Sequence, residues 1–258
     1  MVFDTDLRFG DWERGLLDVM TPAGGGPFPV VVCVHGGGWR FGAKDDMHPY
    51  AEWLLSLGIA SVLPNYRLSD EAIHPAQQDD IIAALNWIAD HADEYHFDVD
   101  RIGLTGVSAG GHLSAQVGCL AKERAPRVHV RCMYPVCPPT DFPQFIADNP
   151  GIGQTIEQFL GASLADLSDM LKDVSPVTHV HADAPVCRCV HGDLDELVPP
   201  NQSRIFVEAL RNAGVEADVL RVPHAGHAAY QPNVEPLEPL GGLESYLGFF
   251  RKHLVEAQ

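Results

Sequence analysis

The chain has 258 residues, 46% of them hydrophobic, and carries a formal net charge of −18 at pH 7. It is long and apolar enough to bury a large core, which excludes a disordered protein. An acidic surface repels phosphate backbones and anionic lipid headgroups, so nucleic acid and membranes are not expected partners.

Short apolar runs alternate with helical patterns along the chain, which predicts a mostly parallel sheet with crossover helices. Residues 30–34 read Val-Val-Val-Cys-Val, as expected for a strand buried on both faces. The predicted strands are residues 16–20, 30–34, 59–63, 101–107, 128–136, 186–190 and 216–222. The predicted helices are residues 75–92, 110–121, 202–212 and 243–254. We expect one domain over residues 1–258.

Residues 138–173 interrupt this alternation with several prolines and then short amphipathic patterns. An insertion this long between two strands is usually functional, so we predict a cap or lid within the single domain. Its apolar residues are too many for a solvated loop, and we expect some of them, Phe159 in particular, to line the substrate pocket. The alternative is that they only cover the edge of the core.

The six cysteines fall mostly in apolar, strand-like runs, where cysteine behaves as a small hydrophobic residue. We expect reduced, structural thiols and a cytoplasmic setting. The first residues have neither the basic nor the apolar region of a secretory signal, and no apolar run is long enough to span a bilayer. The spacing of cysteine and histidine predicts no metal site.

Residues 106–110 read Gly-Val-Ser-Ala-Gly, between a predicted strand and a predicted helix. This is the context of the G-x-S-x-G nucleophile elbow, in which a strained serine projects its hydroxyl above the sheet edge. Side chains at positions 106 and 110 would clash in so tight a turn. Ser108 is therefore the predicted nucleophile.

Residues 35–39 read His-Gly-Gly-Gly-Trp, directly after the strand 30–34. Three glycines allow backbone N–H groups to converge on the oxygen of a tetrahedral intermediate. We predict the amides of Gly37, Gly38 and Ala109 as an oxyanion hole, against the alternative of a merely flexible turn. Trp39 is expected either to shape the pocket wall or to pack in the core.

A serine nucleophile needs a base that is oriented by a third group, in the chain order serine, acid, histidine. Residues 191–199 and 224–227 each follow a predicted strand and supply these groups. From the residues alone, Asp193, Asp195 and Glu196 compete for the acid, and His224 and His227 for the base. His35 and His191 are expected to anchor their turns by hydrogen bonds.

With these motifs the chain resembles the esterase/lipase-like α/β hydrolases that carry HGGGW and GxSAGG motifs. These are relatives of the hormone-sensitive-lipase group, of feruloyl and acetyl-xylan esterases, and of arylformamidases. The matching positions are residues 17–19, 35–39, 65–68, 75–80, 100–102, 106–113, 175–176, 191–192, 195, 198–199, 202–203 and 226–227. Where family members often have Gly-Phe after the Gly-His pair, this chain has Ala228 and Ala229.

The resemblance implies the α/β-hydrolase fold, an acyl-enzyme intermediate and a short cap. In the family pattern H-G-x-x-D-x-x-V-P the acid is Asp195, and the Gly-His pair makes His227 the base. Tyr66-Arg67 and Asp80 are expected to form a buried pair that ties the loop at Asn65 to the next helix, in a structural rather than a catalytic role.

We therefore expect a serine esterase acting on small or medium acyl esters, with Trp39 and Phe159 contacting the substrate and no cofactor or metal. The expected partner is a small-molecule ester, and homo-oligomer formation is left open. An amide hydrolase of the arylformamidase or small-peptidase type is one alternative. A non-catalytic, ligand-binding homologue is the other.

Overall fold

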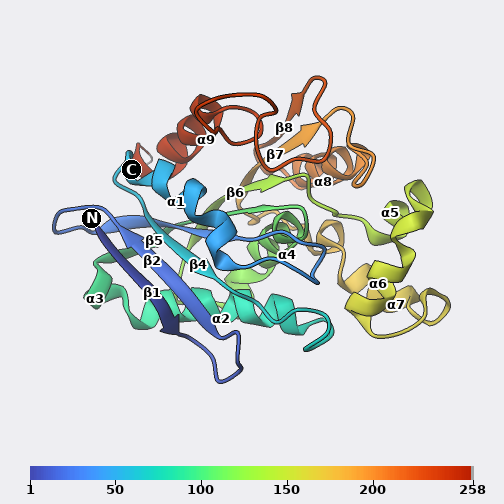
Figure 1. Ribbon diagram of the computed structural model, residues 1–258, viewed down its shortest axis with the longest axis horizontal. Helices are drawn as coiled ribbons and strands as arrows, with labels where there is room; N and C mark the ends of the chain where they lie inside the picture. The colour runs from blue at the N-terminus through green and yellow to red at the C-terminus, as the bar shows by residue number, and fades with distance from the viewer. Residues whose placement is uncertain (257–258) are drawn as a thin grey trace.

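The computed structural model describes residues 1–256 and contains one eight-stranded sheet (Figure 1). The strand order is β1-β2-β4-β3-β5-β6-β7-β8, antiparallel for the pairs β1–β2 and β2–β4 and parallel for the rest. The strands are β1 (Val2–Arg8), β2 (Leu16–Thr21), β3 (Phe28–Val34), β4 (Ala60–Pro64), β5 (Phe97–Val107), β6 (Val130–Val136), β7 (Val186–Gly192) and β8 (Ala217–Val222).

Helices cover both faces of the sheet. The α-helices are α1 (His48–Leu55), α2 (Ala76–Asp90), α3 (Ala92–Tyr95), α4 (Ala109–Arg124), α5 (Phe142–Asp148), α6 (Gly153–Leu160), α7 (Ser168–Asp173), α8 (Asn201–Asn212) and α9 (Leu243–Phe250). Short 3-10 turns are η1 (Lys44–Met47), η2 (Pro150–Ile152), η3 (Leu164–Asp166) and η4 (Pro176–His179), and a π-helical turn η5 (Arg251–Val255) follows α9.

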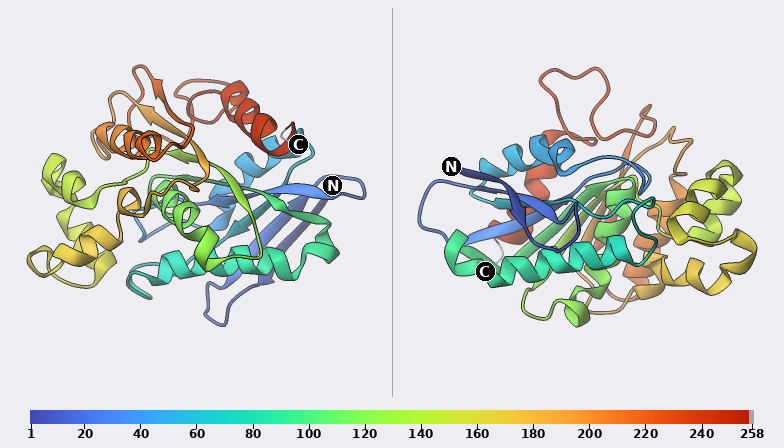
Figure 2. Two further views of the ribbon diagram at one scale, coloured as in Figure 1. Left: turned by 180° about the vertical axis from the view of Figure 1, so that it is seen from behind. Right: turned by 60° about the horizontal axis from the view of Figure 1, so that its bottom comes forward.

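Strand β3 shows why the core has two layers. All seven of its residues are buried, and successive side chains point to opposite faces. Val30 and Val32 pack in the cluster that contains residues of α2 and α4, whereas Val31 and Cys33 pack with residues of α1 and α9. Figures 1 and 2 show α2 on one side of the sheet and α1 and α9 on the other.

The predicted elements are all present, with shifted boundaries. Strand β5 begins four residues earlier than predicted, and the last α-helix ends at Phe250 rather than at 254. The sequence patterns missed β1 and α1. Strand β1 is polar, largely exposed and paired only at the sheet edge with β2, so it lacks the apolar run that marks the inner strands.

The segment between β6 and β7 forms α5, α6 and α7, which Figure 1 shows gathered at one end of the sheet. Its apolar residues do pack inward, as the sequence predicted. The buried ones are Phe142, Phe145, Ile156, Phe159 and Leu160. They belong to the same core cluster as Trp39 and Leu113, so this segment is fastened to the domain by hydrophobic burial.

The predicted link between the loop after β4 and helix α2 is confirmed. Arg67 Nη2 lies 2.6 Å from Asp80 Oδ1, and the Arg67 amide donates to Asp80 Oδ2 at 2.8 Å. Asp80 is fully buried, and the guanidinium supplies the hydrogen bonds that its carboxylate needs there.

The six cysteines are free and buried. Cys187 and Cys189 are two residues apart on β7 and therefore share one face of the strand, with their Sγ atoms 3.9 Å apart. Burial raises the pKa of Cys33 and Cys119 to about 12, which keeps these thiols protonated and unreactive. Within residues 1–256, no helix has the length and apolar character needed to cross a bilayer.

Candidate active site

Ser108 occupies the sharp turn between β5 and α4. Its backbone has φ 55° and ψ −116°, a conformation that non-glycine residues rarely adopt. The turn is fixed on both sides, because the Ser108 amide donates to Val136 O at 2.8 Å and its carbonyl accepts from the His112 amide at 2.8 Å. The strained serine that the sequence predicted is therefore present.

The two glycines of this turn are required by close backbone contacts. A Cβ at Gly106 would lie 2.4 Å from Gly110 O, and a Cβ at Gly110 would lie 2.1 Å from Val34 O. The turn can therefore press against the end of β3 only while both positions lack a side chain. This contact also brings Ser108 next to the loop that follows β3.

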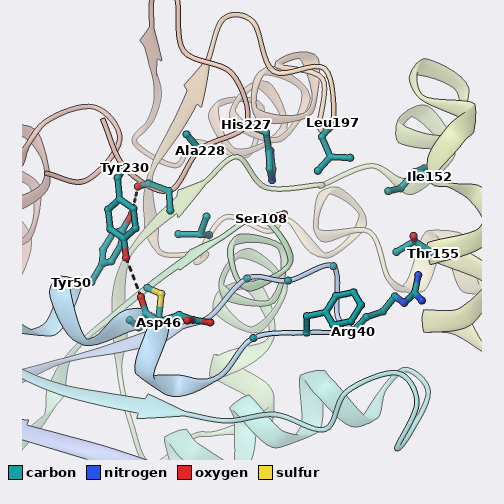
Figure 3. A pocket seen from close by; sticks show the side chains of 18 residues that line it. Arg40, Asp46, Tyr50, Ser108, Ile152, Thr155, Leu197, His227, Ala228 and Tyr230 are labelled. Carbon is teal, nitrogen blue, oxygen red and sulfur yellow. Dashed lines mark hydrogen bonds between the residues drawn. The ribbon is translucent and has the colours of Figure 1, made fainter. Parts of the chain in front are cut away.

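His227 and Asp195 come from the loops after β8 and β7. His227 Nδ1 is 2.8 Å from Asp195 Oδ2, and Asp195 Oδ1 accepts the amides of Leu197 at 3.0 Å and Val198 at 2.8 Å. A carboxylate can only accept, so His227 Nδ1 is the donor, and in the neutral ring Nε2 is the nitrogen that can accept a proton. Figure 3 shows the imidazole pointing toward Ser108 across a shared pocket.

Asp195 is held in its charged form. Burial by itself raises the pKa of this carboxyl, but hydrogen bonds from His191, His227 and the Val198 amide hold it well below its ordinary value. It is only 4% exposed and remains ionised at neutral pH.

The competing residues lie elsewhere. Asp193 Oδ1 pairs with Arg221 Nε at 2.7 Å on the surface, and Glu196 and His224 are exposed. We call residues 191–199 the acid loop. His191 is bound within it, with Nδ1 2.7 Å from Ser203 Oγ and Nε2 2.8 Å from Val198 O. As expected, its role is to anchor this turn.

The loop after β3 presents backbone N–H groups to the same place. Gly37 has φ +109° and Gly38 φ +59°, and a Cβ at Gly37 would lie 2.2 Å from Phe41 O. Within residues 1–256, the amides of Gly37, Gly38 and Ala109 have no acceptor. Gly37 and Gly38 line a pocket together with Ser108, and the buried Ala109 directly follows Ser108 in the chain. Unpaired donors at such a position are available to a developing negative charge.

His35 anchors this glycine turn, as the sequence predicted. Its Nδ1 lies 2.8 Å from Gly36 O, and its ring stacks on Tyr66 with centroids 4.1 Å apart. Burial lowers the pKa of His35 to about 4, so the ring is neutral at physiological pH.

A pocket of about 730 Å³ connects these groups. We call residues 36–42 the oxyanion loop, after the role that the sequence predicts for them. This loop forms one side of the pocket, together with Asp46, Met47 and Tyr50 from η1 and α1. The remaining lining residues are Val107, Ser108, Ile152, Thr155, Leu197, His227, Ala228, Ala229 and Tyr230. The segment with α5–α7 thus reaches the pocket through Ile152 and Thr155.

Trp39 and Phe159 lie behind the pocket wall instead of in it. Trp39 is 2% exposed and Phe159 is fully buried, and their rings stack with centroids 4.4 Å apart. Trp39 Nε1 also donates to His112 Nδ1 at 3.2 Å. These two residues were expected to contact substrate, but burial of two large rings against α4 keeps both out of the lining.

The sequence analysis missed most of the residues that do form the pocket walls. Tyr50 lies on α1, which was not predicted, and Tyr230 directly follows the predicted loop residues Ala228 and Ala229. Arg40 and Asp46 follow the glycine motif without any distinctive spacing. Their position close to the glycine motif was the one sequence feature that could have indicated these residues as part of the pocket.

Two clusters in the described chain have residue types that can bind a metal: Cys137, His191 and Asp195, and Asp18, Asp45 and His48. In the first, His191 and Asp195 already make the hydrogen bonds of the acid loop. In the second, Asp18 pairs with Lys44 Nζ at 2.8 Å and with His48 Nε2 at 2.8 Å. Protein partners satisfy these ligand atoms, and we assign no metal site to either cluster.

The chain is similar to curated ester hydrolases. It is 33% identical over 248 residues to the probable carboxylic ester hydrolase LipM, and 31% identical over 238 residues to the esterase LipQ, both from Mycobacterium tuberculosis. Each match covers 87% of this chain and 56% of the relative. The chain thus spans about half the length of these curated relatives.

Among solved structures, a truncated carbohydrate esterase from gut microbiota matches with a TM-score of 0.82 at 25% identity, covering 98% of this chain and 96% of that one. A bifunctional GH43-CE protein from Bacteroides eggerthii matches with a TM-score of 0.86 at 28% identity, covering 97% of this chain and 38% of that one. The BD-FAE family model matches residues 17–210, which include the oxyanion loop, the elbow and the acid loop. This chain therefore belongs to the BD-FAE family and has the α/β-hydrolase fold.

Proposed function

We propose that this protein is a serine hydrolase of carboxylic esters, with Ser108, His227 and Asp195 as its catalytic triad. The observation that carries the proposal is the position of His227. Its Nδ1 is bound to a buried carboxylate, while its ring points toward a strained serine in the same pocket. The similarity to curated ester hydrolases supports the same reaction.

In the proposed mechanism, His227 Nε2 takes the Ser108 proton as Oγ attacks the ester carbonyl carbon. The imidazolium that forms is stabilised by Asp195, which also holds the ring in the productive tautomer. When the tetrahedral intermediate collapses, His227 returns the proton to the leaving alcohol. Water then attacks the acyl-enzyme by the same two steps and releases the acid.

The oxyanion of both intermediates is proposed to bind the amides of Gly37, Gly38 and Ala109. These donors are held before the substrate arrives, so no reorganisation is needed during the reaction. Each such donor typically lowers the barrier by about 2.7–4 kcal/mol.

The pocket supports a small or medium acyl ester, because it is largely apolar and has a volume of about 730 Å³. We further propose that residues 138–173 act as a cap that forms part of its wall through Ile152 and Thr155. A single domain over residues 1–258 and a cytoplasmic setting also remain predictions; the latter rests on the free cysteines.

The test replaces the nucleophile. Ser108→Ala should lower kcat on p-nitrophenyl butyrate by several orders of magnitude, and fluorophosphonate should label the parent protein at Ser108 only. Ser114→Ala is the matched control: it is the same substitution on the adjoining helix α4, and within residues 1–256 the buried Ser114 hydroxyl has no hydrogen-bond partner.

Full activity of Ser108→Ala would refute the proposal. A substrate panel separates the remaining alternatives. Faster cleavage of N-formyl anilides than of esters would identify an amide hydrolase, and saturable binding without turnover would identify a ligand-binding homologue.

A further inference from the structure

Arg40 is a pocket-lining cation without an acidic partner. It lies in the oxyanion loop, two residues after Gly38, and its side chain lines the same pocket as Ser108. Within residues 1–256 no carboxylate pairs with it, and its Nε atom is buried without any hydrogen-bond acceptor. Its guanidinium carbon lies 5.5 Å from the centroid of the Phe41 ring.

This isolation is unusual in so acidic a chain. Asp and Glu number 35 against 17 Lys and Arg, and pairs such as Arg67–Asp80 and Arg221–Asp193 show arginines meeting carboxylates elsewhere. A partly buried guanidinium with an unsatisfied N–H is costly, because desolvation is not offset by a partner. A ligand that accepts hydrogen bonds from the Nη groups, which are not among the buried unpaired atoms, would offset part of that cost.

The loop itself does not need this side chain. The turn is closed by the backbone amides of Arg40 and Phe41, which both donate to Gly37 O at 3.0 Å. Any non-proline residue at position 40 could make that bond. The Arg40 guanidinium is therefore available to bind a ligand in the pocket.

The surroundings of Arg40 suit an anion at one end of the pocket. Figure 3 shows Arg40 with Ile152 and Thr155 on one side of Ser108, and Asp46 with Tyr50 and Tyr230 on the other. In the described chain the Thr155 hydroxyl has no hydrogen-bond partner, and Thr155 lines the pocket, so it can donate to the same ligand. Asp46 is exposed and would repel an anion from the opposite end.

We propose that the preferred substrates are esters that carry a carboxylate, which Arg40 binds in a forked, charge-assisted contact while Ser108 attacks the ester. This inference rests on the proposed esterase function and names the substrate class of that site. Guanidinium and carboxylate match in two parallel N–H···O bonds. The net charge of −18 opposes an anion in the pocket only weakly, since salt largely screens exposed charges that lie more than roughly 8 Å away at physiological ionic strength.

The carboxylate can belong to the acyl part or to the alcohol part, and matched pairs of esters distinguish the two. For the acyl part, monoethyl terephthalate is compared with ethyl 4-carbamoylbenzoate. For the alcohol part, 4-acetoxybenzoate is compared with 4-acetoxybenzamide. Each pair exchanges a carboxylate for a neutral amide of similar shape. The two esters of a pair also differ in intrinsic reactivity, so charge recognition is measured by comparing the ratio of kcat/KM within a pair between the parent protein and its Arg40 variants.

We expect a ratio of at least tenfold in favour of the carboxylate for one pair, and a decrease of tenfold or more in Arg40→Gln. Arg40→Lys should retain part of the preference for the carboxylate, because lysine keeps the positive charge but cannot make the two parallel hydrogen bonds of a guanidinium. Arg204→Gln is the control: it changes the net charge equally, but Arg204 is exposed on α8 and pairs with Glu208. Its ratios should match those of the parent protein.

Hydrolysis of the neutral esters without a carboxylate preference in either pair would overturn the inference and leave the esterase function intact. So would a preference that Arg40→Gln and Arg204→Gln change equally. If no ester is hydrolysed and fluorophosphonate does not label Ser108, the proposed function fails, and the inference fails with it.

Discussion

The His227 imidazole donates from Nδ1 to Asp195 Oδ2 at 2.8 Å, while the other oxygen of Asp195 is held by the amides of Leu197 and Val198. The carboxylate therefore cannot rotate without losing two backbone hydrogen bonds. This arrangement sets the orientation of the acid, and through it the tautomer of His227. It also separates Asp195 from its neighbour Asp193, which faces Arg221.

Asp195→Asn should lower kcat by about 10³–10⁴-fold at neutral pH. The two amides keep the side-chain oxygen of asparagine in the Oδ1 position, so the NH₂ group faces His227 and forces the proton onto Nε2. That tautomer cannot accept the proton of Ser108. The measurement is kcat on p-nitrophenyl butyrate.

Asp193→Asn is the matched control for that variant. It removes only a surface ion pair between a half-buried Asp193 and an exposed Arg221, and it should stay within about threefold of the parent protein. If Asp193→Asn were the more damaging substitution, the assignment of the acid would be wrong.

Gly37→Ala should lower kcat by about 100-fold or more with a smaller change in KM. The added Cβ would lie 2.2 Å from Phe41 O, so the loop must move and the amide must leave its position. Gly38→Ala should be milder: its positive φ strains an alanine as well, but the nearest atom to its Cβ is 3.8 Å away, so no steric clash forces the loop to move. Equal kinetics for the two variants would argue against an ordered oxyanion loop.

Ile152→Ala should shift acyl-chain preference toward longer esters, because Ile152 lines the pocket and its truncation widens it. We expect the ratio of kcat/KM for p-nitrophenyl octanoate to butyrate to rise at least threefold. Phe159→Leu is the comparison. It should lower the free energy of unfolding by about 1 kcal/mol and leave that ratio unchanged, because Phe159 lies behind the wall. If Phe159→Leu changed the ratio and Ile152→Ala did not, the acyl group would bind beside Phe159 and not beside Ile152.

His112 should make the protein less stable in mild acid. Its Nδ1 accepts from Trp39 and its Nε2 donates to Val174 O at 2.8 Å, so a second ring proton would face another donor. Burial lowers the pKa of His112 to about 3, against roughly 6.5 in the unfolded chain. Below about pH 6.5 His112 is therefore protonated in the unfolded chain but stays neutral in the folded chain. The free energy of unfolding decreases as the pH falls, because protonation favours the unfolded state.

Between pH 7.5 and 5.5 this one residue should remove about 1.4 kcal/mol from the free energy of unfolding. Urea unfolding at both pH values measures the loss, and in His112→Asn it should be smaller by that amount. The neutral His35 remains in both proteins, so its own contribution cancels in the comparison. An equal loss of unfolding free energy in parent and variant would show that His112 does not cause the acid sensitivity.

Local patterns predicted the elbow and the glycine turn because each depends on a steric need within a few residues. Gly106 and Gly110 are separated by four positions and meet each other directly, and β3 is apolar at every position because it is buried on both faces. The same reasoning missed β1, which is polar and pairs only at the sheet edge.

The sequence by itself thus determined the parallel sheet, the strained serine and the two glycine-rich turns, since their requirements are local. Residue types left three acids and two histidines open, and the family pattern favoured Asp195 and His227. Only the tertiary structure brought these two together, and only it placed Arg40 and Tyr230 in the pocket while burying Trp39 and Phe159 behind it. Such contacts join loops that are far apart in the chain, and packing across the whole sheet decides which side chains face one another.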